Sequence, residues 1–331
     1  MSGRGEAETV EALDEAVARF LLIELPPAGN GAPCYDFPYE ALRRVAYESA
    51  SLARRRLLHR RAADALSDRY ERDPLSARAA VIAGHLQRAG RDAEAAGWWW
   101  RAAARARELY AHAEAHAHLR QALALGYPQV PGSIEAGDVL TVLGRYQEAL
   151  AEYETAAAGS DGDHAIAAVI EHKLAEVHHR LGDWALADAH LAAAADLLAP
   201  GDLGGRARVG ADRAVVAYRL GDHARAARLG AAALADAGRA ADPAAIAQAR
   251  NVLGMLAASE GDPGAAEALE LGSELGDQHR VAALHTNLAD LLHASGQREE
   301  ALGHLKEAAR RFAALDAGGA PRPEIWTLVE W

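Results

Sequence analysis

"GQREEAL", residues 296–302, decides the fold, because related copies of it recur along the chain. In every copy a glycine is followed five residues later by an alanine. The copies are GRYQEAL from Gly144, GDWALAD from Gly182, GDHARAA from Gly221, GDPGAAE from Gly261 and, more distantly, GRDAEAA from Gly90. The alanines are Ala95, Ala149, Ala187, Ala226, Ala266 and Ala301. From Ala149 onward they are about 35 to 40 residues apart, which indicates a repeated unit.

Each residue type in this pattern suits a junction between two helices. Glycine adopts the left-handed backbone conformation that ends a helix, and an aspartate just after it can cap the next helix. Such aspartates occur at Asp183, Asp222 and Asp262. The alanine is small enough to lie where two helices cross closely, and apolar residues four to seven positions later give the second helix one apolar face. The pattern therefore predicts a series of helical hairpins.

These hairpins resemble the tetratricopeptide repeat. Leu253-Gly254 with Ala266, Leu174-Ala175 with Ala187, and Leu288-Ala289 with Ala301 match its signature. The resemblance implies an all-α protein, a right-handed tetratricopeptide-repeat superhelix (α-solenoid), with about six hairpins over residues 71–316 and a closing helix over 317–331. Two regions fit less well. The helix pairing between Gly90 and Gly144 stays open, and the short second helix after Gly261 predicts a kink.

Residues 1–70 lack the repeat. Their order is a helix (10–20), two short strands (21–25 and 34–37) and two further helices (39–50 and 52–66), which predicts a small winged-helix-like unit with a β-hairpin. The run from Tyr35 to Leu66 is similar to a segment of the bacterial STAND-type signalling ATPases that precedes their helical-repeat arm. The matching residues are Phe37, Arg43, Ala46, Tyr47, Arg55, Arg56, Leu58 and His59; Pro38 and Tyr39 replace a frequent histidine. The resemblance implies the arm of such a regulator.

No phosphate-binding loop of the G-x-x-x-x-G-K-[ST] type occurs in the sequence, so ATP binding in that family's manner is not expected. The net charge of −12 argues against non-specific nucleic-acid binding. The single cysteine, Cys34, excludes an internal disulfide, and no apolar run has the length of a membrane span. We expect a cytoplasmic protein without cofactor or metal, with nucleic acid and membranes unlikely partners.

Three further motifs have both a structural and a functional interpretation. His112 and His116 are spaced to hold a metal, but are interpreted as solvent-facing, with Ala115 in packing. Trp98 to Trp100 spread around a helix, so one is expected inside, with the others covering a neighbour or facing a partner. The basic cluster could bind DNA or form salt bridges with Glu40, Glu48 and Asp64, or with an ATPase partner. It consists of Arg43, Arg44, Arg54, Arg55, Arg56, Arg60 and Arg61.

In tetratricopeptide arrays the first helix of each hairpin lines an inner groove that holds peptides or small effectors. Counting back from the repeat alanines gives the polar residues expected in that groove. These are His172, Glu176, Arg208, Asp212, Asn251, Asn287 and Asp290. We therefore expect a non-enzymatic regulatory protein that binds a peptide, protein or small effector and biases a separate or excised ATPase or output domain. The alternatives are a hydrolase using groove His, Asp and Glu, and a DNA-binding regulator using the arginine cluster.

Overall fold

The computed structural model describes residues 5–26, 34–73, 75–160, 162–259, 282, 285–286, 288–290, 292–293 and 296–316. The chain forms two compact units. The first comprises Met1–Leu109 with Ala117–Tyr127, and the second comprises Tyr110–His116 with Pro128–Trp331. The predicted closing helix over 317–331 and the predicted kink after Gly261 lie outside the described residues.

The first unit begins with the predicted order of helix, two strands and two helices. Its elements are α1 (Glu6–Ala18), β1 (Ile23–Leu25), β2 (Cys34–Asp36), α2 (Glu40–Ser49), α3 (Leu52–Tyr70), α4 (Ala79–Ala89) and α5 (Asp92–Glu108). α6 (His112–Ala124) is divided between the two units. The strands pair antiparallel, with Ile23 opposite Asp36 and Leu25 opposite Cys34. The winged-helix likeness and the boundary at residue 70 stay predictions.

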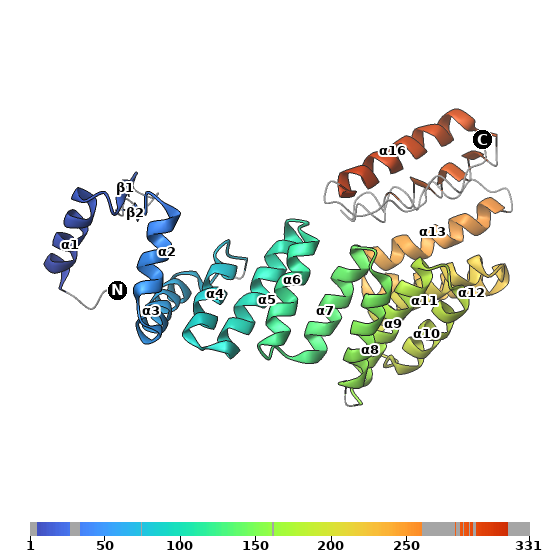
Figure 1. Cartoon of the computed structure of the whole chain (residues 1–331). Helices are drawn as coiled ribbons and strands as arrows, with labels where there is room; N and C mark the ends of the chain where they lie inside the picture. Colours follow the sequence, from blue (N-terminus) through green and yellow to red (C-terminus); the bar gives the residue numbers. More distant parts are fainter. Residues whose placement is uncertain are drawn as a thin grey trace. The chain divides into compact units, whose positions relative to one another are not determined.

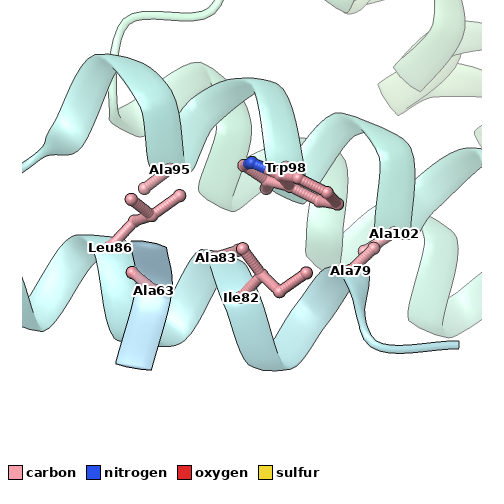
Figure 2. Close-up of a cluster of buried hydrophobic side chains, with 8 residues drawn as sticks. All are labelled: Ala63, Ala79, Ile82, Ala83, Leu86, Ala95, Trp98 and Ala102. Carbon is pink, nitrogen blue, oxygen red and sulfur yellow. The ribbon is translucent and has the colours of Figure 1, made fainter. Parts of the chain in front are cut away.

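The core of this unit lies where the α4–α5 hairpin meets α3. Figure 2 shows Ile82 and Leu86 of α4 facing Trp98 and Ala95 of α5, with Ala63 of α3 beside them. The tryptophan run therefore lies on the second helix of this hairpin. As predicted, one tryptophan is internal, since only 8% of Trp98 is exposed.

The two remaining tryptophans of the run are half-buried against later residues of the same unit. The ring centroids of Trp99 and His118 are 5.0 Å apart, and those of Trp100 and Tyr127 are 5.8 Å apart. His112 and His116 are also half-buried, so they face solvent only in part. The cause is the neighbouring Ala115, whose complete burial places this part of α6 against packed helices.

The second unit is a succession of helical hairpins (Figure 1). Its helices are α7 (Gln129–Val142), α8 (Tyr146–Ala158), α9 (His164–Arg180), α10 (Trp184–Leu197), α11 (Leu203–Arg219), α12 (His223–Ala240), α13 (Pro243–Ser259) and α16 (Arg298–Asp316). α7 pairs with α8, α9 with α10, and α11 with α12.

The repeat residues take the places that the pattern predicts. The repeat glycines within the described residues have left-handed backbone angles, as at Gly182 with φ of 77°. The described repeat alanines are fully buried, at 0% exposure; they are Ala95, Ala149, Ala187, Ala226 and Ala301. Asp222 accepts a hydrogen bond from the Arg225 N–H, as expected of a cap. Asp183 makes no such bond; its carboxylate oxygen Oδ2 lies 4.0 Å from His178 Nδ1.

Two histidines pair between α3 and α4 and should make the first unit sensitive to acid. The Nδ1 atoms of His59 and His85 are 2.8 Å apart, and the Tyr47 hydroxyl is 3.0 Å from His59 Nε2. One Nδ1–H must donate the hydrogen bond and the other Nδ1 must accept it, so the accepting ring is neutral. Burial lowers the pKa of both histidines, and the nearby Arg88 lowers both further.

Because these pKa values are lowered in the folded state, the unfolded chain takes up protons first as the pH falls. Stability from this pair is therefore complete above the ordinary histidine pKa, about 6.5, and decreases below it. We expect the wild-type melting temperature to fall between pH 7.5 and pH 5.5, and His85→Gln to reduce that fall. His164→Gln, at the exposed start of α9, is the control. An equal fall in wild type and His85→Gln would contradict the assignment.

Candidate functional site

The second unit contains a cavity of about 1270 Å³. Its walls come mainly from α9 and α11, with further residues from α10 and the segment 198–202, and α13 contributes Gln248 and Asn251. α9 and α11 are the first helices of their hairpins, which is where the repeat pattern predicts the groove. The volume is somewhat larger than that of most small-molecule sites.

Helical periodicity brings the lining side chains to one face of each helix. On α9 this face includes Val169, His172 and Glu176, and on α11 it includes Arg208 and Asp212. The spacing of three or four residues is the spacing of neighbours on one side of a helix. Other residues of these helices, such as Leu174 and Ala207, lie off the cavity lining and belong to the packed core. Polar residues can therefore line the cavity without interrupting the core.

One hydrogen-bonded chain joins the three lining helices. His172 Nε2 of α9 is 2.7 Å from Asp212 Oδ2 of α11, and Gln248 Nε2 of α13 donates to Asp212 Oδ1 at 3.2 Å. Both side chains of the His172–Asp212 pair are about two-thirds covered, with 27% and 32% exposed. Asp212 therefore connects successive hairpins at the surface that a ligand would contact.

A second cluster links α9 to the α7–α8 hairpin. The Lys173 ammonium lies 3.0 Å from Asp138 Oδ1 and 3.8 Å from Glu176 Oε2. Arg180 donates to Glu176 Oε1 at 2.9 Å. Burial alone would raise the pKa of Glu176, but the cations of Lys173 and Arg180 outweigh it and hold that pKa below its ordinary value. Glu176 is therefore ionised at neutral pH.

His179 presents a neutral ring beside this cluster. Burial is the largest influence on it and lowers its pKa. Its ring lies edge-on to Trp184, with centroids 4.9 Å apart, and its Nε2 is buried without a hydrogen-bond partner. Such an unsatisfied ring nitrogen costs free energy, so a ligand that reorients the ring could satisfy it.

The predicted groove residues divide into three groups. Those that line the cavity together are His172, Glu176, Arg208, Asp212 and Asn251. Asp290 is described but lies outside the cavity lining, and burial raises its pKa. Asn287 lies outside the described residues. As ligand-binding residues, all seven stay predictions.

Sequence reasoning missed Lys173, His179 and Gln248, which also line the cavity. The available signal was the helical face itself, because residues 172, 173, 176, 179 and 180 lie on one side of α9. Counting back from the repeat alanines selects only some positions on each helix and omits the adjacent positions on the same face. On α11, Arg208 donates to Asp242 Oδ2 at 2.7 Å, just before α13.

The cavity lining limits the chemistry that this site can perform. None of the described residues that line it is a serine, threonine or cysteine, so the lining offers the His172–Asp212 pair none of these nucleophiles to activate. Within the described part of the chain, no group of three or more His, Cys, Asp or Glu side chains is placed to hold a metal ion. None of the described helices is both long and apolar enough to span a membrane.

The arginine cluster lies on α2 and α3 and forms few of the expected salt bridges. Arg43 pairs with Glu40, as expected. Asp64 instead pairs with Arg91 at the start of α5. Arg56 donates to the Ala89 carbonyl oxygen at 2.9 Å, and Arg55 lies over the Tyr47 ring, 5.0 Å from its centroid.

Comparison with solved structures shows the fold. The apo form of RapI superposes with a TM-score of 0.59 at 14% identity, over 71% of this chain and 90% of that chain. Aspartyl phosphate phosphatase F from Bacillus subtilis gives 0.62 at 11% identity, over 76% and 67%. Cut9, in the APC/C Cut9–Hcn1 complex, gives 0.51 at 20% identity, over 76% and 44%.

The fold is a tetratricopeptide-like helical-repeat solenoid. This confirms the fold class that the repeated glycine and alanine pattern predicts. No protein-family model matches the sequence, and no curated protein sequence matches it.

Proposed function

We propose that this chain is a non-enzymatic regulatory protein that holds an extended peptide, or an extended segment of a partner protein, against α9, α11 and α13. The observation that carries the proposal is the cavity of about 1270 Å³ on the first helices of successive hairpins. Its walls offer an amide at Asn251, carboxylates at Glu176 and Asp212, and apolar surface at Val169. An extended peptide needs this combination, because its backbone requires donors and acceptors at regular intervals.

Structures of the same fold with bound peptides support this ligand class. A Rap protein complexed with Competence and Sporulation Factor superposes with a TM-score of 0.59 at 12% identity. The Rap conjugation gene regulator of plasmid pLS20, in complex with the Phr* peptide, superposes with a TM-score of 0.57 at 16% identity.

We further propose that the protein acts in the cytoplasm as the sensor arm of a STAND-type signalling ATPase or transcriptional regulator. The run from Phe37 to His59 supports this, together with the helix, hairpin and helix order that precedes the repeats. Peptide binding would then shift the population between two arrangements of the hairpins. The hydrogen-bonded series His172, Asp212 and Gln248 is suited to that role, since it joins three helices at the cavity surface.

Selection from a random decapeptide display library with the full chain tests the proposal. The selected peptides should bind in solution with one-to-one stoichiometry. Asn251→Ala should weaken their binding about tenfold, since it removes an amide that donates to and accepts from a peptide backbone. Calorimetric titration measures the affinity, and circular dichroism checks the fold.

The matched control is Gln147→Ala, which removes an exposed amide of α8 outside the cavity lining. This variant should bind the selected peptides as the wild type does. If no peptide is selected, or if selected peptides bind Asn251→Ala with unchanged affinity, the site assignment is wrong.

A further inference from the structure

α1 is an amphipathic helix whose apolar stripe is only partly covered: Leu13 and Val17 are half-buried and Val10 is exposed. Val10, Leu13 and Val17 follow one side of the helix, and 51% of Val10 is exposed. No described side chain of α1 is buried, and no other described helix or strand packs extensively against it. A helix of 13 residues is marginally stable in water on its own. The helix therefore needs a surface to cover it.

The charge of α1 indicates what that surface must carry. Its five charged residues are all acidic: Glu6, Glu8, Glu11, Asp14 and Glu15. Arg19, just beyond the helix, pairs with Glu15 at 2.6 Å and offsets only one of these charges. A partner surface should therefore combine apolar side chains with cations.

The outer face of α3 has that combination. Arg54, Leu57, Leu58 and Arg61 follow each other at the spacing of one helical face, opposite the face that carries buried Ala63. Leu57 is 36% exposed and Leu58 is 42% exposed. Among the described residues, Arg54 forms no ion pair with a carboxylate.

The adjoining helix α2 extends this face. It has no buried residue, and Val45 is 61% exposed. Its Arg44 also forms no ion pair with any of the described carboxylates. The leucines of α3, Val45, Arg44 and Arg54 together form a basic apolar surface, named here the α2–α3 face.

We propose that α1 of one copy of this chain docks on the α2–α3 face of a second copy. The two surfaces are complementary in charge and both carry an apolar stripe, as in helix-in-groove recognition. Both surfaces occur on the same chain, so two copies can exchange their α1 helices in a two-fold arrangement that forms the same contact twice. The dimer buries both exposed stripes.

Sedimentation velocity of the full-length protein across a concentration series tests the proposal. The wild type should dimerise reversibly. Asp14→Arg, beside the apolar stripe of α1, or Arg54→Glu should each raise the dimer dissociation constant at least about tenfold, because each places like charges at both contacts. The combined variant, Asp14→Arg with Arg54→Glu, should restore the dissociation constant to within about threefold of the wild type, because opposite charges face each other again.

Two controls make the same charge changes elsewhere on exposed helix positions. They are Glu154→Arg on α8 and Arg120→Glu on α6, and both should dimerise as the wild type does. A protein that stays monomeric at every concentration would overturn the proposal, as would a dimer that is insensitive to both single substitutions. Salt-dependent binding of duplex DNA by a monomer, abolished by Arg54→Glu, would also overturn it and assign the α2–α3 face to nucleic acid.

Discussion

Replacing Tyr153 by alanine should lower the free energy of unfolding of the second unit by about 3–5 kcal/mol, the usual cost of removing a buried aromatic ring. The side chain is 1% exposed and packs with Leu140, Ile170 and Leu174, so it joins α7, α8 and α9. The ring also fills the space beside Gly137, where an added Cβ would lie 2.5 Å from the Tyr153 Cε1 atom. Urea denaturation followed by circular dichroism measures the loss.

Tyr153→Phe separates the ring from the hydroxyl. The hydroxyl donates to Asp138 Oδ1 at 2.7 Å, and Asp138 keeps its ion pair with Lys173 in this variant. The expected loss is therefore only about 1 kcal/mol. Repeat arrays can unfold in parts, so hydrogen exchange should show the largest loss of protection in α7, α8 and α9. If Tyr153→Ala costs no more than Tyr153→Phe, the ring does not hold these helices together.

Much of this fold follows from local sequence chemistry. The glycine that ends a helix and the alanine five residues later act within one hairpin, so the sequence alone places Gly182 at a turn and Ala187 at a helix crossing. Tyr153 follows in the same way from the apolar face of its helix. Its bond to Asp138 could not be predicted, because it depends on the relative rotation of α8 and α7, which packing in three dimensions sets.

In the candidate site, too, some features follow from the sequence and others depend on packing in three dimensions. The hairpin order identifies α9 and α11 as groove helices, and helical spacing selects their exposed faces, which is why His172, Arg208 and Asp212 share one cavity. Helical spacing does not say which polar side chains meet across neighbouring helices. The bond between Asp212 and Gln248, 36 residues apart, and the orphaned Nε2 of His179 therefore required the structure. For α1, a short apolar stripe indicates that a partner is needed without identifying it.

Asp212→Ala should weaken binding of a selected peptide about 30-fold, or about 2 kcal/mol, if the proposed function is correct. The substitution removes the acceptor for both His172 and Gln248, so α9, α11 and α13 lose the hydrogen bonds that connect them at the cavity. The peptide must then order these side chains when it binds, and that ordering reduces affinity. Titration calorimetry measures the affinity, and the melting temperature is compared in parallel.

Asp188→Ala is the matched control. Asp188 accepts two bonds from Arg225, at 2.8 Å and 2.9 Å, and so joins α10 to α12 away from the cavity lining. This variant should lose stability yet bind the peptide normally, whereas Asp212→Asn, which keeps one acceptor oxygen, should recover part of the affinity. Adding His172→Ala to Asp212→Ala should cost less than His172→Ala costs alone, because the shared bond is already absent. Equal losses of affinity in Asp188→Ala and Asp212→Ala would show instead that binding depends on the general stiffness of the repeats.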